Sequence, residues 1–179
     1  MKTVKVWDPL VRLFHWSLVA GIVANGLLLD EESKLHIQVG YVVLGLVAVR
    51  IVWGLIGTKH ARFSDFPPDL GASLEQARDV SLGRRRVHLG HTPLGALMIY
   101  NILATVLLIG ASGYMMTTIT FWGMEWVEEV HEVFVNWLWV SVVLHVAAVL
   151  FESRRTGVNL PRAMVTGRKV LPEWSQSKP

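Results

Sequence analysis

Four long apolar stretches, separated by short charged segments, run along this chain of 179 residues. They cover approximately residues 10–29, 37–56, 94–116 and 130–151. A helix of about 20 apolar residues, rising about 1.5 Å per residue, is long enough to cross the hydrocarbon core of a bilayer. Charged residues make up 17% of the chain, against about 25% in soluble domains. The pattern predicts an all-α integral membrane four-helix bundle, formed as one domain over residues 1–179.

The N-terminal part of the chain has lysines followed by an apolar run, an order also found in secretory signal peptides. Arg12 and His15 interrupt that run, and no small-residue cleavage site follows it. We therefore expect residues 1–25 to be a retained helix rather than a segment that is removed.

The only long polar segment lies between the second and third apolar stretches, at residues 57–92. Ser73 and Gln76 have the spacing of a capping box, which predicts a short amphipathic helix at residues 73–80. We expect this helix to lie on the membrane surface. Pro93 stands where a first-turn proline belongs and predicts the start of the third span.

The basic residues are distributed on one side of the predicted bundle. Of the 17 lysines and arginines, only Lys34 lies in the two short loops between spans. The others flank the start of the first span, end the second or lie in the segment after it, or follow the fourth: Lys2, Lys5, Arg12, Arg50, Lys59, Arg62, Arg78, Arg84, Arg85, Arg86, Arg154, Arg155, Arg162, Arg168, Lys169 and Lys178. The positive-inside rule then predicts that both termini and the loop at residues 57–92 are cytoplasmic.

The absence of cysteine limits the redox chemistry open to this chain. With no cysteine, disulfides, iron–sulfur clusters and thioether-attached haem are excluded. A redox cofactor would be held non-covalently, and the seven histidines supply the obvious ligands. No catalytic triad, phosphate loop or nucleic-acid signature is present, and the run Arg84–Arg86 is explained by topology, so no nucleic acid partner is expected.

Two histidines of the fourth span lie on one face of the predicted helix but far apart along it. His131 and His145 are 14 residues apart, close to four helical turns, so they share a face and lie about 21 Å apart along the axis. Side chains so far apart cannot hold one metal ion. Two stacked haems, one toward each membrane surface, fit that distance.

Depth in the membrane predicts the partners of these two histidines. His15 begins the first span at the cytoplasmic depth of His145, and His36 opens the second span at the outer depth of His131. Two imidazoles on each iron leave no open coordination position, which suits electron transfer rather than oxygen chemistry. The alternative, that the four are interfacial or packing residues, is the one we prefer for the remaining histidines, His60, His88 and His91.

Two arginines lie at the cytoplasmic depth of His15. Arg12 and Arg50 are candidates to pair with haem propionates, because a guanidinium matches the fork of a carboxylate. A role as positive-inside anchors is equally compatible with their positions. Most tryptophans lie near span ends and are explained as an aromatic belt. Glycines in the spans allow a flat macrocycle or a neighbouring helix to approach, so they do not discriminate.

Several segments, in order along the chain, carry a family resemblance. They are WDPLVRLFHW at residues 7–16, HIQVGY at 36–41, RIVWGLIGTKHARFSDF at 50–66, GHTPLGALM at 90–98, SGYM at 112–115, HE at 131–132, LH at 144–145 and PRAMVTGRK at 161–169. With them the sequence resembles the bacterial cytochrome b561 family, which is related to the b-type cytochrome subunits of nickel–iron hydrogenases.

The resemblance implies a four-helix bundle in the bacterial inner membrane that holds two haems b between its helices. Carried over by position, the ligands are His15, His36, His131 and His145. Members move electrons between a membrane quinone and a partner outside the bilayer. The quinone is ubiquinone or menaquinone.

The resemblance leaves the partner open among three kinds of protein or substrate. One is a periplasmic redox protein such as a c-type cytochrome, another is superoxide, in a superoxide-to-quinone oxidoreductase, and a third is a hydrogenase-like enzyme of which this chain is the cytochrome b subunit. A non-redox metal transporter is a further alternative. The outer loops are acidic and favour a cationic protein over an anionic small molecule.

Overall fold

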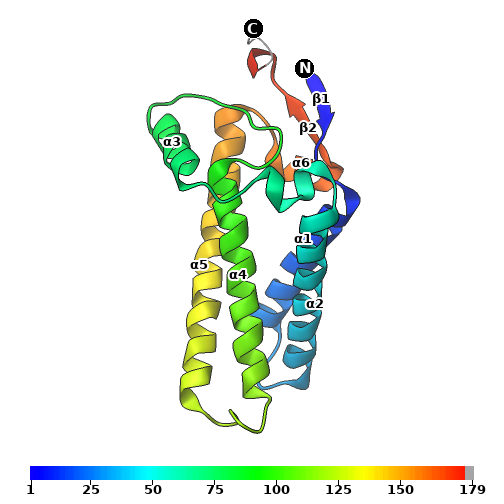
Figure 1. Cartoon of the computed structure of the whole chain (residues 1–179), viewed down its shortest axis with the longest axis vertical. Coiled ribbons are helices and arrows are strands. Elements are labelled where there is room, and N and C mark those ends of the chain that lie inside the picture. The colour runs from blue at the N-terminus through cyan, green and yellow to red at the C-terminus, as the bar shows by residue number, and fades with distance from the viewer. Residues whose placement is uncertain (176–179) are drawn as a thin grey trace.

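A computed structural model describes residues 1–175 and shows a bundle of four long helices (Figure 1). These are α1 (Pro9–Val23), which continues through a π-helical turn (Ala24–Leu28), α2 (Lys34–Ile56), α4 (Pro93–Met116) and α5 (Glu125–Thr156). Each is long and apolar enough to cross a membrane, α1 together with its π-helical turn, so the prediction of four spans is confirmed. Lys178, one of the basic residues used to predict orientation, lies outside the described residues.

Short elements gather at one end of the bundle, which we call the sheet end (Figure 1). They are α3 (Leu70–Ser81), α6 (Leu160–Thr166), the strands β1 (Lys2–Lys5) and β2 (Arg168–Leu171), and 3₁₀ turns at Lys59–Ala61, Phe63–Asp65 and Glu173–Ser175. The loops between α1 and α2 and between α4 and α5 lie at the opposite end, the hairpin end. Both terminal segments and the 57–92 loop thus share one end, and its cytoplasmic placement stays a prediction.

Side-chain caps set the beginnings of the first three spans. The carboxylate of Asp8 accepts a hydrogen bond from the backbone N–H of Val11 at 2.9 Å, and the Ser33 and Thr92 hydroxyls cap α2 and α4 in the same way. Such caps satisfy backbone donors that have no partner inside the helix. Pro93 occupies the first turn of α4, as predicted.

The fourth span is longer than its apolar stretch. The sequence predicted residues 130–151, whereas α5 runs over Glu125–Thr156 and has 32 residues. Glu125 and Glu128 lie in its first turn and Arg154 and Arg155 in its last, where charges of these signs stabilise a helix through its dipole. Helical structure therefore continues past the apolar stretch at both ends.

The α3 helix confirms the predicted amphipathic helix but not its cap. It begins after Asp69, whose carboxylate accepts from the backbone N–H of Ala72 at 2.9 Å. Ser73 lies inside the helix and donates to the carbonyl of Asp69. Gln76 accepts from the backbone N–H of Leu94 instead of capping α3. The predicted capping box was wrong because a better cap, an aspartate, stands four residues before Ser73.

The small sheet was not predicted from the sequence. β1 and β2 pair antiparallel, with Lys2 opposite Leu171 and Lys5 opposite Arg168. The pairing joins the segment before the first span to the segment after α6.

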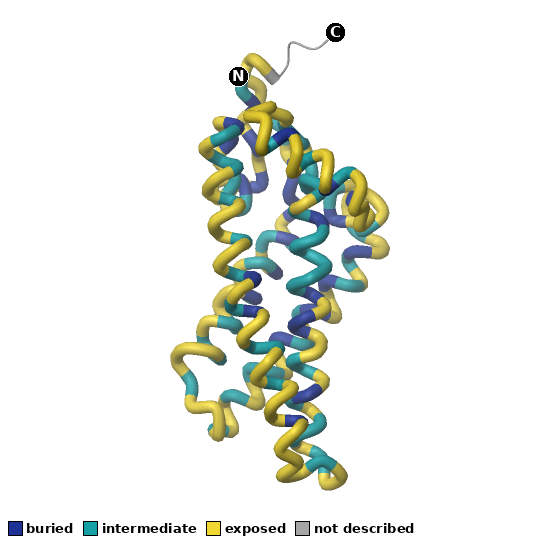
Figure 2. Tube along the Cα trace, turned by 90° about the vertical axis from the view of Figure 1, so that its left-hand side faces the viewer, coloured by how far each residue is buried: buried dark blue, intermediate teal, exposed yellow. Residues whose placement is uncertain are grey.

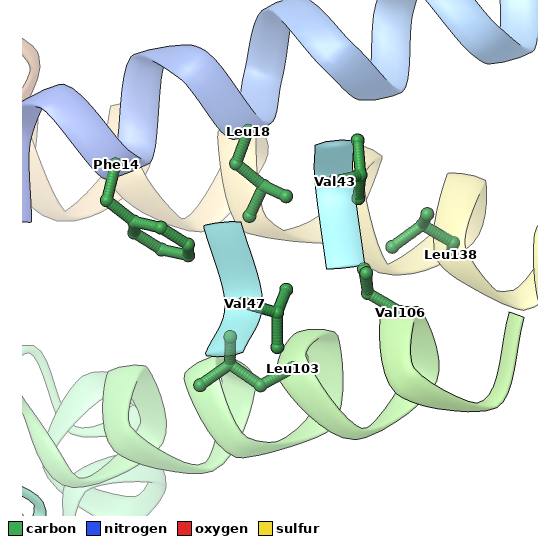
Figure 3. Packing of buried hydrophobic residues seen from close by; sticks show 7 residues of the cluster. All are labelled: Phe14, Leu18, Val43, Val47, Leu103, Val106 and Leu138. Atoms are coloured by element: carbon green, nitrogen blue, oxygen red, sulfur yellow. The ribbon is translucent and has the colours of Figure 1, made fainter. Parts of the chain in front are cut away.

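Apolar side chains from all four spans meet at the centre of the bundle. Figure 3 shows them pointing toward one another: Phe14, Leu18, Val43, Val47, Leu103, Val106 and Leu138. The outward faces of the spans are largely exposed (Figure 2), as expected where lipid takes the place of water. Tight packing is the main attraction between helices in lipid, so this core fixes the distances between the spans.

Asp8 links α1 to the end of α2. Its side chain is only 8% exposed, and its second carboxylate oxygen accepts from the Trp53 indole at 3.1 Å and from the Thr58 hydroxyl at 2.6 Å. Burial alone would raise the pKa of Asp8, but the hydrogen bonds from Thr58, Val11 and Trp53 hold it below its ordinary value. The stabilisation is therefore present above the ordinary pKa and is lost as the pH falls through the lowered one.

We predict that Asp8→Ala lowers the free energy of unfolding by about 2–4 kcal/mol, because a cap is lost and two partly buried donors lose their acceptor. Asp69→Ala is the matched control, since that exposed aspartate only caps α3 and should cost about 1 kcal/mol. Thermal unfolding of the two variants in detergent checks the difference. Equal losses for both would contradict the linking role of Asp8.

Candidate functional site

The structure brings His15 and His145 together near the sheet end. His15 lies on α1 and His145 on α5, and their ring centres are 6.4 Å apart. A metal–imidazole bond is about 2 Å long, so two imidazoles on opposite sides of one metal have ring centres roughly 6 Å apart. Both rings are half-buried. The spacing therefore allows both rings to bind one iron.

His36 and His131 form the second predicted pair, nearer the hairpin end. His36 lies in the first turn of α2 and His131 near the start of α5. The two rings are near enough to interact electrostatically, and both are half-buried. A hydroxyl from α4 also reaches this pair, because Ser112 Oγ lies 3.0 Å from Nδ1 of His131. Ser112 begins the SGYM segment of the sequence, where no pattern assigned it a role.

Arg50 is buried in α2, with 3% of its surface exposed. Its guanidinium lies 4.9 Å from the centre of the Phe63 ring, a cation–π contact. Asp8 and Tyr100 are close enough to act on its charge. Nη1 is buried without a hydrogen-bond partner among the described residues. A buried guanidinium nitrogen of this kind is costly unless an acceptor reaches it.

Arg12 has a clearer protein partner. Its Nη1 donates to the backbone carbonyl of Val165 at 2.6 Å, which joins α1 to α6. Its Nε is buried and finds no partner in the described part of the chain. Arg12 therefore already holds two helices together, whereas Arg50 has an aromatic contact and a free donor.

The polar atoms left unpaired around the two histidine pairs fit a haem. Nδ1 of His15 and of His36, Nε of Arg12 and Nη1 of Arg50 are buried without a partner among residues 1–175, as is Nδ1 of the loop residues His88 and His91. Buried donors are seldom left in this state, so a bound acceptor is a physical explanation for the two arginine atoms, and no hydrogen bond from a described residue holds the His15 or His36 ring at Nδ1. Histidine nitrogens suit iron, and a guanidinium suits a propionate. The residues present therefore fit a haem b with its propionates.

A buried lysine, Lys169, lies at the sheet end and was not predicted from the sequence. Lys169 of β2 is 3% exposed, donates to the carbonyls of His88 and Gly90 at 3.0 and 2.9 Å, and lies over the Trp7 ring. Burial lowers the pKa of Lys169 to about 8. In sequence this lysine resembles any other positive-inside residue, so no signal singled it out.

The three loop histidines have structural surroundings. The His91 ring packs between Trp7 and Phe66, with ring centres 4.6 and 4.1 Å away. Burial, and then the charge of Lys169, lower the pKa of His91 to about 3, so the ring is neutral at neutral pH. Burial also lowers the pKa of His88. His60 Nδ1 lies 2.9 Å from the Asp65 carboxylate. These contacts agree with the packing role expected for all three.

Comparison with known proteins gives a family for this arrangement. A family model described as prokaryotic cytochrome b561 matches residues 6–167, which is most of the chain. No curated protein and no solved structure gives a significant match. Proteins of this family bind haem b and transfer electrons in membranes. The chain, with four helices able to span a bilayer, therefore belongs to the prokaryotic cytochrome b561 family and is a bacterial multi-pass b-type membrane cytochrome of electron transfer.

Proposed function

We propose that this cytochrome carries two haems b, one held by His15 and His145 and the other by His36 and His131. The observation that supports this most strongly is the 6.4 Å between the His15 and His145 ring centres, on helices that are far apart in the sequence. A bound haem supplies a one-electron carrier. Two histidines on each iron would leave no open position for oxygen, which suits electron transfer.

In the proposed arrangement the protein lies in the bacterial inner membrane with its sheet end in the cytoplasm. It transfers electrons between the quinone pool and a periplasmic redox partner. The quinone is ubiquinone or menaquinone. The spacing of His131 and His145 along α5 sets the two irons about 21 Å apart, one toward each surface. The two haems would thus serve as successive electron carriers across the bilayer.

The arginines contribute to the haem nearer the cytoplasm. Arg50 Nη1, buried and without a partner among the described residues, is the donor we assign to a propionate. Arg12 assists through its Nε while Nη1 stays on Val165. Each charge offsets the negative charge of a propionate in a region with little water.

The surface at the hairpin end supports a basic protein as the partner. Seven carboxylates lie there, all exposed and without a salt bridge to a described residue: Asp30, Glu31, Glu32, Glu125, Glu128, Glu129 and Glu132. Such a surface attracts a basic cytochrome c and repels superoxide. We therefore prefer the cytochrome c to the superoxide alternative.

A metal transporter is the competing function from another class. Transition-metal sites for a bare ion commonly use three or four protein ligands. Within residues 1–175 no three histidine, aspartate or glutamate side chains come together in that way. The histidines instead come in pairs, which is the arrangement that a haem needs.

The haem content tests the proposed ligand pairs. Purified protein should contain close to two haems per chain by pyridine haemochrome analysis. His145→Ala should lose or disturb the haem near the sheet end while the other survives, and His131→Ala should do the reverse. His91→Ala is the control, because its ring packs on aromatic side chains and should leave both haems in place. A single haem that tolerates both ligand substitutions would end the proposal.

Arg50→Gln tests the propionate assignment. Removing a buried positive charge beside a haem disfavours the added electron, so the midpoint potential of the haem near the sheet end should fall. Arg62, also basic but exposed in the loop after α2, provides the control substitution Arg62→Gln, which should leave that potential unchanged. Spectroelectrochemical titration measures both. An unchanged potential in Arg50→Gln would show that Arg50 serves only packing and topology.

Electron exchange with a basic cytochrome c tests the partner and the function together. After reduction with quinol, the protein should pass electrons to the cytochrome rapidly at low salt and more slowly as the screening length shortens to about 8–10 Å. Changing Glu125, Glu128 and Glu129 to Gln should slow the exchange at low salt.

The control for that experiment is Glu75→Gln with Glu173→Gln, two exposed carboxylates at the sheet end. It should leave the rate unaltered. A rate that ignores salt and the three hairpin-end substitutions would exclude the acidic surface as a docking site and point to a permanently bound partner subunit.

A further inference from the structure

His131 differs from two of the other proposed ligands in its surroundings. One ring nitrogen each of His15 and His36 is buried without a partner among the described residues. The Nδ1 atom of His131, by contrast, lies 3.0 Å from Oγ of Ser112, a residue of α4 that is only 4% exposed. The two proposed haem sites are therefore built differently around their ligands.

The other contacts of Ser112 decide which atom donates. The hydroxyl has one proton, and the backbone carbonyls of Leu108 and Ile109, which can only accept, lie 2.8 and 3.0 Å from Oγ. With the proton directed to a carbonyl, Oγ accepts from Nδ1–H of His131. Nδ1 therefore carries the proton, and the lone pair of Nε2 is free for a metal.

The next residue lets the ring come close to α4. A Cβ on Gly113 would lie 3.2 Å from Cε1 of the His131 ring, a distance at which the ring would have to shift. Gly113 thus leaves the space that the His131 ring occupies, and the hydrogen bond to Ser112 fixes the rotation of that ring. A histidine held in this way by an acceptor is a common outer-shell arrangement around metals.

We propose that Ser112 is a positioning residue that lowers the midpoint potential of the haem at the hairpin end. The inference rests on the proposed ligation by His131 and gives a role to Ser112, to which the family resemblance assigned none. Accepting a hydrogen bond from Nδ1–H makes the imidazole more electron-donating, and this stabilises ferric iron over ferrous iron. The haem held by His15 receives no such contribution from that ligand, so Ser112 acts on one haem only.

Ser112→Ala tests the proposal by redox titration. It should shift the Fe(III)/Fe(II) equilibrium of one haem about threefold toward ferrous iron, a rise of about 30 mV at 59 mV per tenfold, and leave the other haem unchanged. Ser112→Thr keeps a hydroxyl and should keep the original potential. The electron paramagnetic resonance spectrum of the oxidised protein should change for the same single haem, because the ligand field depends on the imidazole.

Thr105→Val is the matched control. Thr105 is another buried hydroxyl residue of α4, and it donates to the carbonyl of Asn101 at 2.8 Å, with no hydrogen bond to a histidine within residues 1–175. Its substitution should alter neither potential. If Ser112→Ala lowers the yield of folded protein, Ser112→Cys replaces the hydroxyl by a weak acceptor and should shift the potential in the same direction.

Unchanged potentials and spectra in Ser112→Ala and Ser112→Cys, with both haems present, would overturn the role of Ser112. That result would leave the proposed function standing, since it concerns the outer contact and not the ligand. Failure of the proposed function would give a different result, because His131→Ala would then retain both haems. A potential that shifts equally in Thr105→Val would also overturn the inference, because the effect would then come from α4 packing.

Discussion

The hydrocarbon interior offers no water to polar groups, and this constraint governs both the fold and the site. Backbone groups are satisfied by forming helices, and each of the first three spans begins at a side-chain cap. Asn101, in the middle of α4, donates to Ser141 at 2.8 Å and accepts from the Trp137 indole at 3.0 Å. Against this background, the buried Nη1 of Arg50 is a donor that lacks an acceptor among the described residues.

The architecture follows from the sequence where it depends on local patterns. Hydropathy predicted four spans, and Pro93 predicted the start of α4. Hydropathy underestimated α5, since it registers apolar residues and not the helix-favouring charges at Glu125 and Arg155. The pairing of β1 with β2 joins segments more than 150 residues apart, and such long-range contacts leave no local periodicity to detect. The cap of α3 was misassigned because capping motifs are short and compete with one another.

The candidate site divides in the same way. The pairing of His15 with His145 came from helix rise and topology, two regular quantities, and the structure places the rings side by side. The role of Ser112 depends on how α4 is rotated against α5, which no sequence pattern reports. The burial of Lys169 depends on the β1–β2 pairing and was missed with it. A serine followed by a glycine inside an apolar span is the sequence signal that points to Ser112.

Locating iron in the haem-loaded protein tests the central claim most directly. Anomalous diffraction at the iron absorption edge gives the positions of the metals independently of any assignment of the surrounding density. The account predicts two irons about 20 Å apart, one between His15 and His145 and the other between His36 and His131. One iron alone, or an iron bound by His60, His88 or His91, would contradict it.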